Sequence, residues 1–96
     1  MERFFEWDDK KSARNYRKHG IRFEEAALAF DDPLAVSEQD RIENGEQRWQ
    51  TIGIIGDCLL LLVAHAMRFD NDGIEVVRII SARRVDRQER MRYEHG

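Results

Sequence analysis

Arginines crowd the segment EVVRIISARRVDRQER, residues 75 to 90, where Arg78 interrupts an apolar row and further arginines follow it. A guanidinium group stays charged at any cellular pH, and its planar fork of N–H donors matches the oxygens of phosphate or carboxylate. Guanidinium groups held on a rigid strand would stabilise negative charge that develops on a phosphate. The segment therefore predicts either an anion site built on a sheet or an ordinary charged surface.

Arg78 allows two interpretations. A period of two places it on the same strand face as Ile74, Val76 and Ile80, which draws the guanidinium onto an apolar row. A buried charge without a partner costs several kcal/mol. Arg78 then either forms a structural ion pair with a core carboxylate or a helix C-terminus, or lines a concave face that receives phosphate. The pattern alone favours the ion pair, and a solvated face is the simpler interpretation for each later arginine: Arg83, Arg84, Arg87, Arg90 and Arg92.

Other reactive side chains are few. His19, near the expected end of a helix, is either a charge that suits the helix dipole or a general acid or base, since an unperturbed histidine has a pKa of about 6.5. His65 lies among strand residues and is expected to be packed. Cys58, the one cysteine, is expected to be a small buried hydrophobe rather than a nucleophile. The sequence contains no HExxH, CxxC or glycine-rich loop, so neither a metal site nor a cofactor is expected.

The first third of the chain predicts one strand and two helices. Alternation in RFFEWD, residues 3–8, predicts a short strand. A helix is predicted from Asp8 to about His19, because aspartates suit its start and Gly20 suits its end. Apolar residues at helical spacing predict a second helix over residues 23–30, which the following Asp-Pro pair ends.

The remainder predicts three strands and a last helix. After an acidic loop, three apolar segments separated by turns are predicted to be strands: RWQTIGIIG (48–56), CLLLLVAHAM (58–67) and IEVVRIIS (74–81). The apolar run from Leu59 to Val63 indicates a central strand buried on both faces. Asp86 begins a capping box that opens a helix through Tyr93. This order indicates one α+β domain, residues 1–96, with a small antiparallel sheet flanked by two N-terminal helices and one C-terminal helix.

The charge of the chain is uneven. The net charge is -3, yet the last 19 residues carry six basic and three acidic side chains, and a basic block without acids spans residues 10–19. Local patches decide what a small protein attracts, so the total does not exclude a nucleic-acid partner. The longest apolar run, residues 58–64, is far shorter than the roughly 20 residues that span a membrane. The N-terminus lacks the pattern of a secretory signal, so a cytoplasmic protein is expected.

Three stretches resemble the BrnT-type toxins of bacterial type II toxin–antitoxin modules: FEWDDKKSARNYRKHGIRFEEAALAFDDP (5–33), GEQRWQTIG (45–53) and RIISARRVDRQERMRYE (78–94). The motifs FEWD…N…KHG…FEEA, GE.R and R.ISAR…ER..Y occur in this order and at the spacing of the family. The resemblance implies a RelE-like fold and a metal-independent ribonuclease that slows growth by cutting RNA. It also implies an antitoxin that holds the toxin inactive, in a complex that binds its own promoter through the antitoxin.

The resemblance further implies site residues. Arg68, Arg78 and Arg83 match the arginines of the family's active face, and Arg48 is a further member. Such cleavage proceeds by attack of the ribose 2′-hydroxyl on the neighbouring phosphorus, with cations that stabilise the pentacoordinate phosphate. His19 and Tyr93 are the candidates for proton transfer. Three basic residues of the first helix are expected to steer the RNA backbone electrostatically: Lys10, Arg14 and Lys18.

Two other functions stay open. The chain could be a binding module that lacks catalysis and serves as an antitoxin partner or co-repressor subunit. It could also be a related toxin that acts on another target, such as a topoisomerase, because a fold does not determine a function. The binding module predicts no growth arrest on expression alone, and the second alternative predicts arrest with intact RNA.

Overall fold

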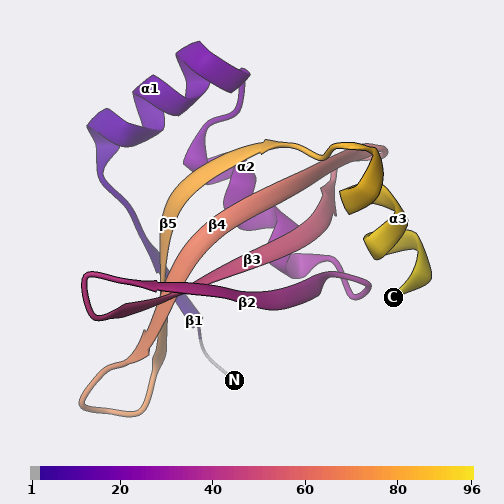
Figure 1. Cartoon of the computed structure of the whole chain (residues 1–96). Helices are drawn as coiled ribbons and strands as arrows, with labels where there is room; N and C mark the ends of the chain where they lie inside the picture. The colour runs from indigo at the N-terminus through magenta and orange to yellow at the C-terminus, as the bar shows by residue number, and fades with distance from the viewer. Residues whose placement is uncertain (1–2) are drawn as a thin grey trace.

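The structure, a computed structural model, describes residues 3–96 as a five-stranded sheet with three α-helices and one short 3₁₀ helix (Figure 1). The elements follow one another in this order: β1 (Arg3–Glu6), α1 (Asp9–His19), α2 (Phe23–Ala27), the 3₁₀ helix η1 (Leu28–Asp31), β2 (Val36–Glu43), β3 (Glu46–Ile55), β4 (Leu59–Phe69), β5 (Glu75–Arg84) and α3 (Arg87–His95). The strand order across the sheet is β1-β5-β4-β3-β2.

The predicted acidic loop is wrong, because residues 36–43 form the edge strand β2, which pairs antiparallel with β3. Most of β2 is exposed, so its acidic side chains remain in water and do not oppose strand formation. The turn from β2 to β3 is Asn44-Gly45, and both residues have positive φ, 54° and 75°. Asn-Gly is the strongest short-range sequence signal for such a two-residue hairpin, so the sequence contained a sign of this hairpin.

The prediction of a purely antiparallel sheet is also wrong. Strands β2 to β5 are antiparallel to their neighbours, but β1 runs parallel to β5 at the other edge of the sheet. The apolar pattern of a four-residue strand does not indicate whether the strand runs parallel or antiparallel to its neighbour. The direction depends on where the chain lies when it enters β5, about 70 residues later. The predicted central strand is confirmed: β4 is the middle strand, and it is buried from Leu60 to Val63.

Helix α1 begins and ends at the predicted residues, and α3 begins where predicted but continues two residues beyond Tyr93. The second predicted helix is only partly confirmed, because its α-helical part, α2, ends at Ala27 and the chain continues as the 3₁₀ helix η1. The Asp8 side chain accepts hydrogen bonds from the first amides of α1, and Gly20 ends this helix with a φ of 76°. Asp86 and Glu89 form the predicted capping box at the start of α3. The polar Asn15 side chain is buried, where it bonds both the amide and the carbonyl of Ala82. These bonds attach α1 along the edge of β5, beyond the end of the short strand β1.

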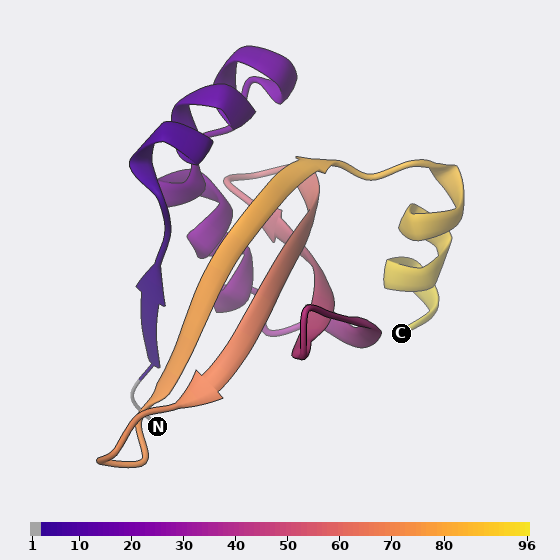
Figure 2. The same cartoon turned by 60° about the vertical axis from the view of Figure 1, so that its left-hand side comes forward.

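The two faces of the sheet are covered unequally. Helices α1 and α2 lie on one side and α3 lies on the other, as Figure 2 shows. The larger core lies under α2 and includes Phe23, Ala26, Leu61, Val63 and Ile79. On the other face, Tyr93 of α3 packs against a small cluster of three buried residues: Ile52, Leu60 and Leu62. Within residues 3–96, no helix lies over the rest of that face, toward the β4–β5 hairpin.

Gly53→Ala is expected to lower the free energy of unfolding by about 2 kcal/mol, within the range for overpacked positions. A Cβ atom at this position would lie 2.3 Å from the carbonyl oxygen of Ala29, which belongs to the backbone of η1 and has no rotamer to move away. Urea unfolding would measure the loss. Gln47→Ala, at an exposed position of the same strand, is the control and should stay within about 0.5 kcal/mol of the wild type. An alanine variant as stable as the wild type would contradict the close approach.

Candidate functional site

Three arginines surround one small residue on the open part of the sheet. Ala66 of β4 pairs with Arg48 of β3 on one side and with Arg78 of β5 on the other. Arg68 follows two residues later on β4, so its side chain leaves the same face. Ala66 is 4% exposed, so the side chains around it cover its methyl group. We call Arg48, Arg68 and Arg78 the arginine triangle.

Each arginine of the triangle holds a carboxylate. One oxygen of Glu46 contacts Nη2 of Arg78 and lies 3.3 Å from Nε of Arg48, so that this side chain bridges two arginines. Glu6 contacts Arg68 at 2.7 Å. Carboxylate and phosphate oxygens use the same guanidinium donors. The triangle therefore presents donors that the oxygens of a phosphate can also use.

The buried position predicted for Arg78 is wrong, although an ion pair is present. The Arg78 side chain is 44% exposed, because α3 covers only the other end of this sheet face. Beyond it, a β-bulge interrupts the pairing of β4 with β5 at Ile80, so the period of two does not continue through the strand. Because of this bulge, the side chain of Ala82, and not that of Ser81, lies on the same buried face as Ile79.

Arg83 lies apart from the triangle. Its partner across the sheet is Leu62, four residues before Ala66 on β4, which corresponds to about 13 Å along a strand. Both terminal nitrogens donate to the two oxygens of Glu89, each at 2.9 Å, and one of these oxygens also accepts the amide of Asp86. The hydrogen bonds with Glu89 raise the pKa of Arg83, and the same bonds lower the pKa of Glu89 against the effect of its partial burial. Arg83 therefore anchors the first turn of α3.

The Tyr93 side chain of α3 is bonded to Asp32 and not to the triangle. Its hydroxyl donates to Asp32 at 2.6 Å, and Asp32 also accepts the amides of Leu34 and Ile54. This bond to a carboxylate raises the pKa of Tyr93. Partial burial of Asp32 opposes ionisation, but the hydrogen bonds from Tyr93 and the two amides lower the pKa of Asp32 overall. The structure does not bring Tyr93 to the triangle.

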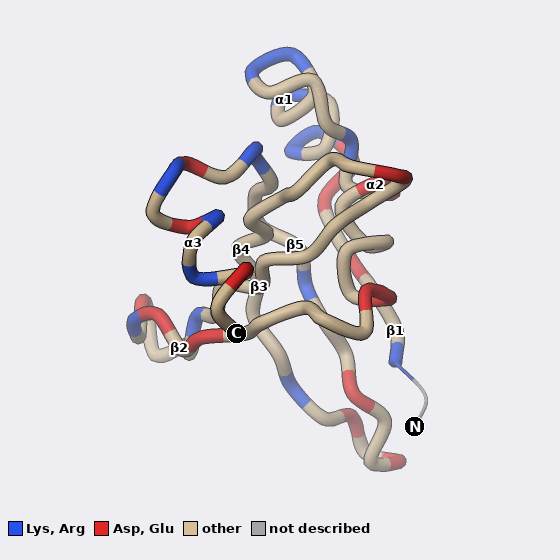
Figure 3. The backbone as a smooth tube through the Cα atoms, turned by 90° about the vertical axis from the view of Figure 1, so that its right-hand side faces the viewer, with Lys and Arg blue, Asp and Glu red and all other residues tan. Residues whose placement is uncertain are grey.

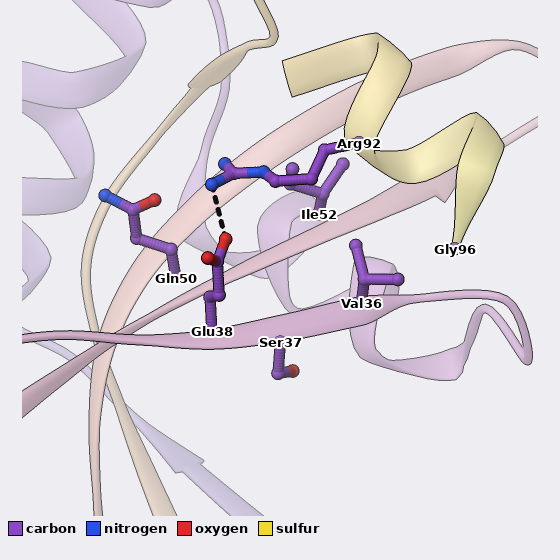
Figure 4. Close-up of a pocket in the computed structure, with 7 residues that line it drawn as sticks. All are labelled: Val36, Ser37, Glu38, Gln50, Ile52, Arg92 and Gly96. Atoms are coloured by element: carbon purple, nitrogen blue, oxygen red, sulfur yellow. Dashed lines mark hydrogen bonds and ion pairs between the residues drawn. The ribbon is translucent and has the colours of Figure 1, made fainter. Parts of the chain in front are cut away.

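A third interaction, an ion pair, connects α3 to the edge strand β2. Arg92 reaches from α3 to Glu38 of β2, as the dashed line in Figure 4 shows. This pair spans a cavity of about 200 Å³, lined by Val36, Ser37, Glu38, Gln50, Ile52, Arg92 and Gly96. Five arginines of this sheet face and of α3 pair with glutamates: Arg48, Arg68, Arg78, Arg83 and Arg92.

The cations of α1 form no ion pairs in the described part of the chain. Lys10, Arg14 and Lys18 are exposed, and within residues 3–96 no carboxylate lies within ion-pair distance of them. Figure 3 shows the Lys and Arg colour over much of α1, whereas basic and acidic segments adjoin along β2 and α3. His19 lies at the end of α1 beside a cavity of about 290 Å³ that Ser81 also lines. It is thus at the edge of the sheet and makes no hydrogen bond to the triangle in the described part of the chain.

His65 and Cys58 lie outside the triangle. The prediction that His65 is packed is confirmed: it is 1% exposed, and its Nε2 bonds the hydroxyl of Thr51 at 2.8 Å. Burial, aided by the nearby charge of Arg3, lowers the pKa of His65 to about 4. The predicted burial of Cys58 is wrong, because it sits exposed in the turn from β3 to β4.

Among residues 3–96, no group of three His, Cys, Asp or Glu side chains is arranged to hold a metal ion. No helix in the same range is long and apolar enough to cross a membrane.

The sequence assigned no role to Glu46 or Glu6. The available signal for Glu46 was its spacing, since a residue two positions before Arg48 shares its strand face.

Two comparisons with known proteins match this chain. A family model described as the ribonuclease toxin BrnT of type II toxin–antitoxin systems matches residues 7–89. The crystal structure of the Brucella abortus ribonuclease toxin BrnT is similar with a TM-score of 0.59, and the match covers 91% of this chain and 100% of that chain. The sequence identity in that match is 22%, so this likeness concerns the fold. No curated protein matches the chain.

Proposed function

The chain belongs to the BrnT family of ribonuclease toxins of type II toxin–antitoxin systems, and from this membership we propose that the arginine triangle binds and cuts RNA. The observation that carries the proposal is the convergence of Arg48, Arg68 and Arg78, from three adjacent strands, around Ala66. All three lie within the segment that matches the family. The RelE-like relationship that the resemblance implies remains a prediction.

In the proposed reaction a backbone phosphate replaces the carboxylates of Glu46 and Glu6 on the triangle. The neighbouring ribose 2′-oxygen attacks phosphorus, and the 5′-oxygen of the next nucleotide leaves. The guanidinium donors stabilise the extra negative charge of the pentacoordinate phosphate, which is work that a metal ion performs in other nucleases. The proposed products are a 2′,3′-cyclic phosphate and a 5′-hydroxyl, and no metal is needed.

Residues outside the triangle take supporting roles in this proposal. The free cations Lys10, Arg14 and Lys18 bind phosphates further along the RNA, which makes binding dependent on salt. Arg83 and Tyr93 position α3 through Glu89 and Asp32 instead of touching the scissile phosphate. A role for His19 in proton transfer stays a prediction.

Membership in a type II family implies an antitoxin partner. We further propose that an acidic, amphipathic segment of the antitoxin covers the arginine face and stops cleavage, and that the complex binds promoter DNA through the antitoxin. The glutamates already seated on the triangle support this, because acidic side chains of a partner would use the same donors. Unrestrained toxin would cut cytoplasmic RNA, and this would stop translation and growth.

RNA cleavage by the purified protein is expected to survive an excess of EDTA, because no step of the proposed reaction passes through a metal. Cleavage should leave 2′,3′-cyclic phosphate ends, which mass spectrometry of a short oligonucleotide would detect. Saturating antitoxin should suppress the reaction. Loss of cleavage in EDTA that magnesium restores would contradict the proposal.

Induced expression without the antitoxin separates the alternatives. The proposed ribonuclease arrests growth and degrades RNA at once. Growth without arrest would favour the binding module, and arrest with intact RNA would favour a target other than RNA.

A further inference from the structure

The proposed reaction needs a group that takes the proton from the 2′-hydroxyl. The two residues expected from the sequence do not lie on the triangle, since His19 is at the sheet edge and the Tyr93 hydroxyl is bonded to Asp32. His65 is buried beneath the opposite face, next to Phe30. In the described range, the group that can accept a proton and that touches two triangle arginines is Glu46.

We propose that Glu46 is the general base of this site, an assignment that rests on the proposed ribonuclease function. Glu46 is the first residue of β3, directly after the tight Asn44-Gly45 turn, so its backbone is fixed by strand pairing from its first position. Its carboxylate lies between Arg48 and Arg78, above Ala66. A phosphate that took the donors of these two arginines would lie against this carboxylate, and the 2′-hydroxyl is attached to the adjoining ribose.

Glu6 and Glu43 fit the role less well. Glu6 touches only Arg68, from the edge strand β1. Glu43 lies 3.8 Å from Arg48 and is shared with Arg41, on the side of the hairpin away from Arg78. Among the glutamates of this face within residues 3–96, only Glu46 lies between two arginines that one phosphate could bridge.

The exchange of anions explains how one carboxylate can serve both as an ion-pair partner and as a base. In the resting protein Glu46 is hydrogen-bonded to Arg78 and lies 3.3 Å from Nε of Arg48. When phosphate oxygens take those donors, the carboxylate is released from them and accepts the 2′-hydroxyl proton as the bond from the 2′-oxygen to phosphorus forms. The bond from phosphorus to the 5′-oxygen breaks, the leaving oxygen takes a proton from water, and Glu46 returns its proton to the solvent.

The test is Glu46→Gln, which keeps the size of the side chain but cannot take up the proton. Loss of a general base should lower kcat by about 100-fold or more. RNA should bind at least as tightly as to the wild type, because a negative charge next to the phosphate is gone. Single-turnover cleavage and fluorescence anisotropy with the same oligonucleotide would measure the two effects, beside the melting temperature. Glu43→Gln is the matched control on the same hairpin and should cleave at close to the wild-type rate.

The expected split between binding and catalysis distinguishes a base from a structural role. If Glu46→Gln cleaves as fast as the wild type, or if binding and cleavage fall together, the assignment is overturned. Glu46→Asp guards against a folding defect, since it retains a carboxylate and should cleave faster than Glu46→Gln. A wild type that cuts no RNA would reject the proposed function itself, whereas an active wild type with an active Glu46→Gln variant rejects only the role of Glu46.

Discussion

Arg78→Ala is expected to reduce RNA cleavage by about 100-fold or more, the usual effect of removing one donor that stabilises a transition-state charge. The fold should survive, because Arg78 is 44% exposed and its partner Glu46 keeps the contact with Arg48. Exposed ion pairs contribute at most about 1 kcal/mol, so the melting temperature should change little. Cleavage rate, growth on induction and melting temperature would be measured for the same preparations.

Arg78→Lys makes this test sharper. Lysine retains the charge but loses the planar fork, so cleavage should lie between that of Arg78→Ala and that of the wild type. Arg41→Ala is the matched control, because Arg41 is also exposed and pairs with glutamate on the neighbouring hairpin but lies outside the triangle. Toxicity of Arg78→Ala at wild-type abundance would remove Arg78 from the site. A much lower melting temperature for this variant would show instead that its ion pair holds the fold together.

Acidification from about pH 6.5 to pH 4 is expected to remove about 3 kcal/mol of stability through His65 alone. Burial lowers the pKa of His65 from its ordinary 6.5 to about 4 in the folded protein. The unfolded chain therefore binds this proton as the pH falls through 6.5, while the folded protein stays neutral at this site until about pH 4. Protonation favours the unfolded state throughout that window, and the stability that neutral His65 provides is fully present above it.

Urea unfolding at several pH values between 7 and 5 would measure this effect, with a limiting slope of about 1.4 kcal/mol per pH unit below pH 6.5. His65→Gln cannot titrate there and should show a flatter profile, whatever its stability at pH 7. His95→Gln, at an exposed position on α3, is the control and should keep the wild-type slope. The same slope in the wild type and in His65→Gln would contradict a buried neutral histidine.

The pKa values of Asp32 and Glu89 are lowered in the folded protein. The stability that these two carboxylates provide is therefore lost only at lower pH, as they become protonated.

Local chemistry explains which elements the sequence predicted. Asp8, Gly20 and Asp86 act on backbone groups within a few residues of themselves, so the ends of α1 and the start of α3 could be read directly. The run from Leu59 to Val63 lacks polar residues, and such a strand can lie only where both faces are covered. The missed strand β2 is different in kind, because an edge strand needs no apolar face and its Asn-Gly turn was the one local sign of it.

For the candidate site, too, some features follow from the sequence and others only from the tertiary structure. The sequence by itself determined the residue types, since a chain with arginine at 48, 68 and 78 and glutamate at 46 can build an anion site without a metal. Only the tertiary structure decided which of them meet: the register across β3, β4 and β5 brings three arginines around Ala66, while the same β5 carries Arg83 to α3 and Glu89. Register and helix coverage arise from contacts between residues tens of positions apart. A period of two along one strand cannot report which end of a sheet face a distant helix covers, and for this reason Arg78 is exposed although its neighbours in sequence are buried.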